Sequence, residues 1–239
     1  MKEDAVREKL ATCTRIFAMQ GLLGMFGHIS AFLPESGRVV ICPGAGADKA
    51  KVQAEDMLVL DLNGRVLEGM GSLPREWPIH TELHRARANA LAVAHCHAHY
   101  TTLFAIASRP LQPVTMGGVI FADCVPVYSA AEFIDTPERG RRLVEVIDNR
   151  RAALLRCHGF VSVAGSIEGM LHTSLVLEDN ARKSVEALQL GDLQPLSHDE
   201  CVRIEPTYPE ARAKTHFTYM AIQEARWDRQ PATGLGPPV

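Results

Sequence analysis

The residues with the clearest chemical potential in this 239-residue chain are the histidines of Ala94-His95-Cys96-His97. The apolar run over residues 91–94 predicts a buried strand that leads into them. Side chains alternate between the two faces of a strand, so His95 and His97 would point to one side and Cys96 to the other. Two imidazoles on one face can chelate a divalent ion without any rearrangement of the backbone.

A third histidine, His158, follows a second apolar run over residues 152–155 and precedes Gly159. If that run forms a neighbouring strand, its end can deliver another ring nitrogen to the same ion. Three protein ligands with one open position are typical of catalytic metal sites, whereas structural zinc sites use all four positions. We therefore expect His95, His97 and His158 to bind a catalytic metal; surface or hydrogen-bonded core histidines are the alternative.

Glu76 opens a helix predicted over residues 76–90, which leads directly into the histidine strand. The helix dipole favours the ionised carboxylate, whereas burial beside Trp77 would raise its pKa. Near a metal-bound substrate, this carboxylate can move a proton to or from carbon or oxygen. The alternative is a carboxylate that serves only the helix dipole, and spacing alone favours that alternative.

Two further histidines, His80 and His84, share the helical face of this glutamate at four-residue steps. A zinc-protease helix needs Glu directly after the first His, and threonine stands there, so we exclude that class. We expect one of the two to orient a neighbour by hydrogen bonding and the other to lie at the surface. His99 is a spare ligand or substrate contact, ranked below His158 because a helix is predicted from residue 101.

Two glycine-rich loops, Gly24–Ser30 and Pro43–Gly46, have backbone amides that could cradle an anion. Neither loop matches a P-loop or a dinucleotide-binding fingerprint. Ordinary turn chemistry explains each of them equally well.

Composition narrows the function classes. The chain is 46% hydrophobic and 22% charged, with a formal net charge of −3, which is typical of a globular protein and gives no basic surface for nucleic acid. The N-terminus lacks the apolar run of a signal peptide, and no segment approaches the roughly 20 apolar residues that span a bilayer. Six scattered cysteines without a Cys-x-x-Cys pair predict reduced thiols and a cytoplasmic location, with no membrane partner.

The elements that must position these residues alternate along the chain. Helices are predicted over residues 3–20, 76–90, 101–107, 137–148, 166–187 and 209–228. Strands are predicted over residues 28–33, 39–42, 57–60, 66–67, 91–97, 114–121, 125–128, 154–155 and 160–165. Adjacent hairpins predict an α/β fold with an antiparallel or mixed sheet covered by helices. We expect a single domain over residues 1–229 and a flexible Pro- and Gly-rich tail over residues 230–239.

These pieces together resemble the class II aldolase/adducin family from about residue 5 to residue 190. The resemblance depends on the order of the Glu, the His-x-His and the later His-Gly. The matching stretches are Gly27-His28-Ile29-Ser30, Pro43-Gly44, Glu55-Asp56-Met57, Asp61-Leu62-Asn63-Gly64, Glu76 with His80, His95-Cys96-His97, His158-Gly159 and Leu177-Glu178-Asp179-Asn180-Ala181.

The resemblance implies a three-layer α/β/α fold around a mostly antiparallel central sheet. It implies a homotetramer with active sites at subunit interfaces. It also implies that His95, His97 and His158 bind a divalent metal ion, zinc or manganese, and that Glu76 is the catalytic acid/base. Separately from the resemblance, we expect Tyr208, His216 and Tyr219 in the C-terminal region to close a neighbour's site.

Two departures from the family pattern bear on the substrate. Its sugar-phosphate aldolases carry a Ser-Ser pair before the catalytic Glu and an Asn in the early loop, where this chain has Pro74, Arg75 and His28. The guanidinium of Arg75 suits a carboxylate instead, and His28 would add a second hydrogen bond. The Gly-His-x-Ser version resembles the branch with decarboxylases of hydroxylated aromatic or pyridine dicarboxylates. We expect His28, Ser30, Gly44 and Arg75 to contact a small-molecule carboxylate substrate.

We therefore predict a divalent-metal-dependent lyase, specifically a decarboxylase of a non-phosphorylated hydroxy-aromatic or hydroxypyridine carboxylate. The first alternative is a class II aldolase that cleaves a small hydroxy-keto substrate, followed by a sugar-phosphate aldolase or epimerase. Decarboxylation and aldol cleavage both break a carbon–carbon bond and leave electrons in an enolate-like product, whose negative charge a divalent cation stabilises. A non-catalytic adducin-like module is the alternative from a different class, and such a module need not keep the metal histidines.

Overall fold

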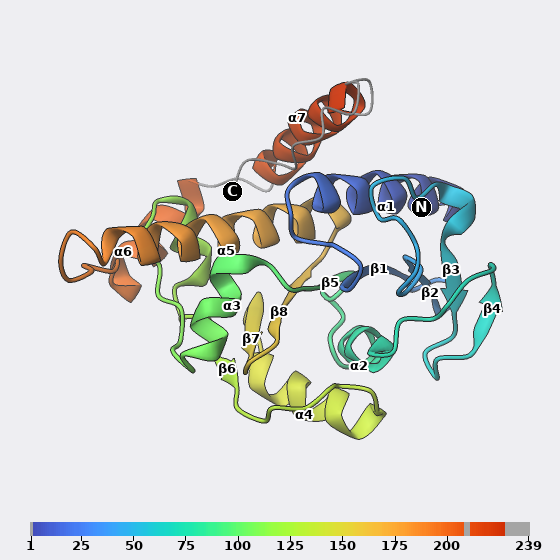
Figure 1. Cartoon of the computed structure of the whole chain (residues 1–239), viewed down its shortest axis with the longest axis horizontal. Helices are drawn as coiled ribbons and strands as arrows, with labels where there is room; N and C mark the ends of the chain where they lie inside the picture. The colour runs from blue at the N-terminus through green and yellow to red at the C-terminus, as the bar shows by residue number, and fades with distance from the viewer. Residues whose placement is uncertain (1, 208–210, 228–239) are drawn as a thin grey trace.

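A computed structural model describes residues 2–207 and 211–227, and in this part of the chain a mixed sheet lies between two groups of helices (Figure 1). The sheet has eight strands in the order β4-β3-β2-β1-β5-β8-β7-β6, and every neighbouring pair is antiparallel except β6 and β7. Its strands are β1 (His28–Leu33), β2 (Arg38–Ile41), β3 (Leu58–Leu60), β4 (Val66–Glu68), β5 (Ala92–Cys96), β6 (Val127–Tyr128), β7 (Ala152–Leu155) and β8 (Gly159–Ala164). This confirms the predicted α/β class and its mostly antiparallel sheet.

Helices cover both faces of the sheet. One face is covered by α1 (Glu3–Met19), α3 (His99–Ile106) and α5 (Ile167–Ala187), with α7 (Ala211–Trp227) packed outside α1 and α5. The other face is covered by α2 (Trp77–Ala86) and α4 (Pro137–Ile147). The short elements are α6 (His198–Ile204), η1 (Ala54–Asp56), η2 (Gly117–Phe121) and η3 (Glu205–Thr207).

The alternation of strand side chains decides what faces α2. In β1, Ile29 packs into the core beneath α1 and α5, so its neighbours His28 and Ser30 point to the opposite face, toward α2. In β5 the same alternation places Ala94 in the core on the side of α1, and His95 on the opposite side, which faces α2. Because His28 and His95 are direct partners in the antiparallel register, the polar residues of two strands meet beneath α2.

A tight hairpin brings the third predicted ligand to the same place. The turn between β7 and β8 pairs Leu155 with Gly159, so His158 is the last residue before β8 begins. Cys96, at the end of β5, pairs with Phe160 near the beginning of β8. A side chain at Gly159 would collide with the carbonyl oxygen of Cys96, so this close approach requires glycine. The hairpin therefore places His158 beside the end of β5.

The helix predicted over residues 76–90 is shorter than expected. It begins at Trp77, with Glu76 as its N-cap residue, and ends at Ala86, before an extended residue at Arg87. The helix predicted over residues 101–107 begins earlier, at His99. Since β5 ends at Cys96, His97 follows the strand and does not belong to it.

The predicted strand over residues 114–121 is wrong, because this segment contains the 3₁₀ helix η2. The buried Asn180 of α5 accepts a hydrogen bond from the backbone amide of Val114, and Thr115 accepts one from Gly118. These local bonds satisfy the backbone without a strand partner. The prediction also missed α6, although Ser197 and Glu200 form a capping box that is visible in the sequence.

Other predictions have mixed outcomes. The six cysteines are free, as expected, and among the described residues no helix is long and apolar enough to cross a bilayer. The predicted tail over residues 230–239 lies outside the described residues. The single domain and the cytoplasmic location stay predictions.

Candidate metal centre

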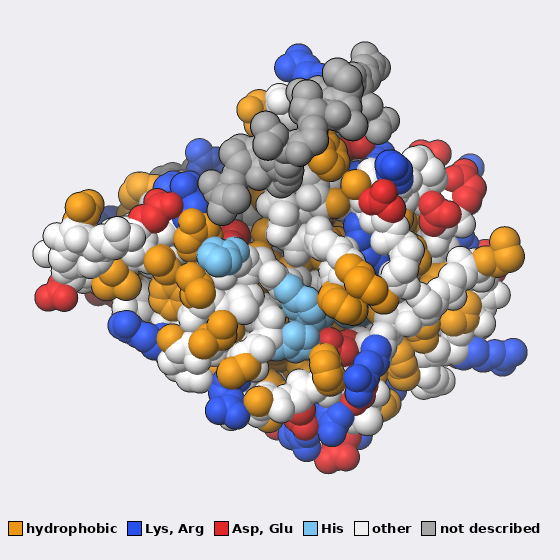
Figure 2. All heavy atoms as spheres, in the orientation of Figure 1, with side chains coloured by type: hydrophobic (Ala, Val, Ile, Leu, Met, Phe, Trp, Pro, Cys, Tyr) orange, Lys and Arg blue, Asp and Glu red, His pale blue; other side chains and the backbone are white. Residues whose placement is uncertain are grey.

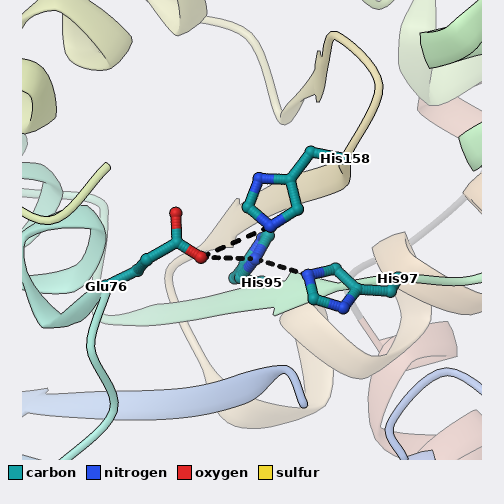
Figure 3. A group of neighbouring side chains, drawn as sticks. All are labelled: Glu76, His95, His97 and His158. Carbon is teal, nitrogen blue, oxygen red and sulfur yellow. Dashed lines mark hydrogen bonds and ion pairs between the residues drawn. The ribbon is translucent and has the colours of Figure 1, made fainter. Parts of the chain in front are cut away.

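Four side chains from three parts of the fold converge on one point (Figure 3). Glu76 comes from the beginning of α2, His95 from β5, His97 from the residue after β5, and His158 from the β7–β8 turn. One potential ligand atom from each lies within 4.8 Å of the others. Figure 2 shows histidine side chains at the centre of the visible face, next to acidic and hydrophobic side chains.

The orientation of His95 follows from a backbone contact. Its Nδ1 lies 3.0 Å from the carbonyl oxygen of Phe160, and a carbonyl only accepts, so Nδ1 carries the proton. In the neutral ring, Nε2 then holds a lone pair, and this atom lies 3.0 Å from Nε2 of His97. A backbone hydrogen bond of this kind is typical of metal-ligating histidines, because it fixes the ring and its tautomer.

The other two imidazoles are held neutral. Burial first, and nearby imidazoles second, lower the pKa of His97 to about 3 and that of His158 to about 4, although the charge of Glu76 opposes both shifts. Nε2 of His158 is a buried ring nitrogen without a hydrogen-bond partner among the described residues. A neutral imidazole is the form that binds a metal ion. An unpartnered ring nitrogen aimed at other ligand atoms therefore fits a cation site.

Glu76 does not cap its own helix, because its side chain makes no hydrogen bond to the first turn of α2. Oε2 lies 3.4 Å from Nε2 of both His95 and His158, and Oε1 accepts a 2.7 Å hydrogen bond from the amide of Ile134. Burial raises the pKa of this carboxyl, but the two imidazoles and the amide outweigh burial, so the pKa is lowered overall. The carboxylate is therefore ionised at neutral pH, and the simple dipole role does not explain its position.

Three imidazole nitrogens and one carboxylate oxygen form a donor set that suits zinc and similar divalent ions. The residues present therefore fit a divalent cation, with His95, His97 and His158 as its nitrogen ligands. Glu76 is close enough either to bind the cation or to act on a substrate beside it. His99, the proposed spare ligand, is exposed at the beginning of α3, where its ring contacts Tyr100, and it is not part of this group.

Behind His95, a row of polar side chains extends into the protein. Nδ1 of His28 lies 2.6 Å from Nε2 of His80, and Nδ1 of His80 lies 2.6 Å from Oγ of Ser30. The same hydroxyl lies 2.8 Å from Nε2 of His84, whose Nδ1 lies 2.5 Å from the carbonyl oxygen of Ala90. His80 and His84 are both buried, so the expectation that one of them lies at the surface is wrong.

The four predicted substrate contacts lie at different depths. Ser30 is fully buried and bonded to two imidazoles, which places it behind His28 and away from a substrate. Gly44 is buried, and its amide donates to the carbonyl oxygen of Ser72 at 2.7 Å, so that amide is not available to an anion. His28, 6% exposed and with its ring 5.1 Å from the ring of His95, is the predicted contact nearest to the metal ligands.

Arg75 lies at the rim, with 64% of its side chain exposed. Its Nε and Nη2 donate to Oδ2 of Asp135 at 2.9 Å and 2.6 Å, and the guanidinium stacks 4.4 Å from the ring of Phe133. Phe133 is itself half exposed, with its ring 5.6 Å from that of His158. The loop over residues 133–135 therefore contacts both Arg75 and Glu76 and adds an aromatic side chain beside the candidate metal ligands.

This loop and one lysine, Lys49, are parts of the site region that the sequence pattern does not predict. Residues 133–135 carry no local pattern that predicts contact with Glu76, because the contact joins segments about 60 residues apart in sequence. Lys49 is 3% exposed, and its ammonium donates to the carbonyl oxygens of Pro43 and Gly44. A lysine close to the glycine-rich loop Pro43–Gly46 was the available signal for this buried contact.

The C-terminal residues that were proposed to close a neighbour's site lie in two settings. His216 packs against α5, where its Nδ1 lies 2.9 Å from Nδ1 of His172. Tyr219 is 58% exposed on α7, and Tyr208 lies outside the described residues. Their role at a neighbouring subunit stays a prediction.

Comparisons with known proteins agree on one family. Residues 8–185 match the family described as "Class II Aldolase and Adducin N-terminal domain". A 3,4-dihydroxyphthalate decarboxylase of Arthrobacter keyseri is 31% identical over 197 residues, which cover 77% of this chain and 79% of that protein. An L-fuculose phosphate aldolase of Escherichia coli O6:H1 is 26% identical, covering 85% and 93% of the two chains. A solved L-fuculose 1-phosphate aldolase superposes with a TM-score of 0.79 at 25% identity, covering 85% and 96%.

The buried histidine row predicts that acid weakens the fold. Burial lowers the pKa of His84 to about 4, although its bond to Ala90 opposes the shift. The unfolded chain has the higher pKa, near 6.5, so it binds the proton first as pH falls, and stability is lost from about pH 6.5 down to about pH 4. This one group should remove ~3 kcal/mol of unfolding free energy over that range.

Urea unfolding of the metal-free protein at a series of pH values measures this loss. His84→Gln should show a smaller decrease on acidification, whereas the exposed control His99→Gln should follow the original protein. Equal pH dependence in all three proteins would contradict the account of His84.

Proposed function

The chain belongs to the class II aldolase and adducin family, and on that premise we propose that it is a divalent-metal-dependent decarboxylase of a non-phosphorylated hydroxy-aromatic or hydroxypyridine carboxylate. Decarboxylases and aldolases of the family are both carbon–carbon lyases. The cation is zinc or manganese, held by His95, His97 and His158. The single observation that carries the proposal is the convergence of these three imidazoles beside one ionised carboxylate.

That convergence favours an enzyme over a non-catalytic module. A module that only binds partners has no need of three ligand nitrogens, one of them buried and unpartnered, around an ionised carboxylate. Ionisable side chains with shifted pKa values that lie in one cluster are typical of functional sites.

The surroundings favour an anionic substrate without a phosphate. Pro74 and Arg75 replace the hydroxyl pair of the sugar-phosphate enzymes, and Nη1 of Arg75 makes no hydrogen bond among the described residues. Lys49 is a buried cation with no described carboxylate within ion-pair distance. Its charge is close enough to His28 to help lower the pKa of that imidazole, after burial, His80 and His95. A substrate carboxylate would balance the charge of Lys49, and it could accept a hydrogen bond from the remaining Nη1 of Arg75, whose charge Asp135 already pairs.

The residues divide the reaction between them. When bound, the cation stabilises the negative charge that develops on substrate oxygen as the carbon–carbon bond breaks. Ionised Glu76 takes a proton from the substrate or from water and delivers it to the ring carbon as carbon dioxide leaves. The amide of Ile134 holds Oε1 of that carboxylate, so Oε2 faces the reaction. The balance is one proton taken up for each carboxylate released as carbon dioxide.

Aldol cleavage of a small hydroxy-keto substrate is the second candidate, because aldolases are also among the relatives. The same residues would then return the proton to the enolate carbon that remains after an aldehyde leaves. We further propose a homotetramer with active sites at subunit interfaces. The position of Arg75 and Phe133 at an open rim supports a site that another subunit completes.

A two-substrate assay tests the proposed reaction. The metal-loaded protein should release carbon dioxide from 3,4-dihydroxyphthalate or a related hydroxy-aromatic carboxylate, and no aldehyde from L-fuculose 1-phosphate. Carbon dioxide is measured with a coupled carboxylase and aldehyde with a coupled dehydrogenase. Aldehyde release without any carbon dioxide release would contradict the decarboxylase.

The acid/base role of Glu76 predicts a separation of metal binding from turnover. Glu76→Gln keeps the shape of the side chain and removes the transferable proton, so kcat should fall by roughly 10²–10⁴-fold. Metal content, measured by atomic emission after dialysis, should remain. Glu82→Gln is a matched control, since Glu82 is also buried on α2 but lies away from the metal ligands and should keep its activity. Full turnover in Glu76→Gln would exclude the role.

A further inference from the structure

The hydrogen-bonded row behind the metal centre ends on an atom that can only accept. Ala90 provides a carbonyl oxygen, which has no proton to give. Nδ1 of His84, 2.5 Å away, must therefore be the donor. In the neutral ring, Nε2 of His84 then holds a lone pair, so the hydroxyl of Ser30, 2.8 Å away, donates to it.

The donor and acceptor roles of the next two hydrogen bonds in the row, as far as His28, follow from the same rule. The hydroxyl of Ser30 has one proton, already given to His84, so it accepts from Nδ1 of His80 at 2.6 Å. Nε2 of His80 is then the acceptor for Nδ1 of His28, also at 2.6 Å. Nε2 of His28 is left with a lone pair. This atom has no hydrogen-bond partner within the residues that the structure describes.

The neutrality of the three rings underlies this reasoning. None of His28, His80 and His84 has a described carboxylate as a hydrogen-bond partner, and all three are buried. An imidazolium in such a setting would carry an unpaired buried charge, which is costly. Each ring therefore has one donor and one acceptor, and one carbonyl sets the direction of the whole row.

The row ends next to the metal ligands. His28 and His95 are register partners on adjacent strands, with ring centroids 5.1 Å apart. Because Nδ1 of His28 faces His80 on α2, Nε2 is on the far side of the ring from that helix. A ligand held by the metal centre would meet His28 at this nitrogen.

We infer that the row from Ala90 to His28 fixes the Nε2 lone pair of His28 as the acceptor for a hydroxyl group of the substrate. This inference rests on the proposed function for its substrate, which must then be a hydroxylated carboxylate with an O–H beside the atoms that bind the metal. A carboxylate or phosphate oxygen at this position would face a lone pair and be rejected. The assignment reverses our expectation that His28 donates a second hydrogen bond to a carboxylate. His80, Ser30 and His84 are positioning residues, which act through His28.

Histidine tautomers can be read directly in the metal-free protein without any substrate. With ¹⁵N-labelled histidine at slightly alkaline pH, long-range proton–nitrogen correlation should show His28, His80 and His84 protonated on Nδ1 and bare on Nε2. Single His→Gln variants assign the signals. A proton on Nε2 of His28 would overturn the inference.

Cutting the row tests its direction. In Ser30→Ala, His84 should keep its Nδ1 proton because Ala90 still accepts it, whereas His80 and His28 should become mixtures of both tautomers. Ser162→Ala is the matched control, since that serine is also fully buried in the sheet but bonds to Ser174 at 2.7 Å. An unchanged His28 signal in Ser30→Ala would overturn the relay.

Binding of small probes to the metal-loaded protein tests the hydroxyl itself. 3,4-Dihydroxybenzoate has two hydroxyl groups, and 3- and 4-hydroxybenzoate each lack one of them. For one of these two probes, the loss of the hydroxyl should weaken binding to the original protein roughly tenfold more than it weakens binding to His28→Phe. Equal losses in both proteins for both probes would overturn the inference. These measurements need no turnover, so a failure of decarboxylation alone would reject the proposed function and leave this assignment intact.

Discussion

The antiparallel register of β1, β5 and β8 is the constraint on which the rest of the structure depends. It pairs His28 with His95 and sets Cys96 against Phe160, so the end of one strand lies against the beginning of the next. Gly159 permits that approach because it has no side chain to collide with Cys96. A shift of one residue would turn every histidine of these strands to the opposite face. The meeting of the candidate metal ligands with His28 is thus a consequence of one register.

A second feature of the site is that burial keeps imidazole side chains neutral. Burial lowers the pKa of His97 and His158 at the candidate cation site and of His28, His80 and His84 behind it. In each group a backbone carbonyl decides which nitrogen carries the proton, Phe160 for His95 and Ala90 for the row that ends at His28. Backbone carbonyl groups therefore orient the imidazole lone pairs at the site. Glu76 contributes an ionised carboxylate to the cluster, and the amide of Ile134 anchors it.

The sequence predicts features that depend on local patterns better than contacts between segments that are far apart in the chain. The His-x-His pattern and the order of the apolar runs predict that His95, His97 and His158 meet, because strands that pair in a sheet bring their ends together. Strand alternation itself positions only His95, since His97 follows β5 and His158 precedes β8. The loop that holds Arg75 and Glu76 escapes prediction, since its contacts join distant segments with no shared pattern. The strand predicted over residues 114–121 does not form, because the side chain of Asn180 on α5 accepts the hydrogen bond of the Val114 amide and the 3₁₀ helix η2 follows. The buried position of His84 depended on the packing of α2, which periodicity alone does not report.

Metal content after exhaustive dialysis against a weak chelator, measured by atomic emission, tests the central claim most directly. The original protein should keep about one divalent ion per chain, and His158→Ala should bind it at least about 100-fold more weakly. His172→Ala is the control, because His172 pairs with His216 away from the cluster and should keep full occupancy. Full metal content in His158→Ala, or no retained metal in the original protein, would contradict the account.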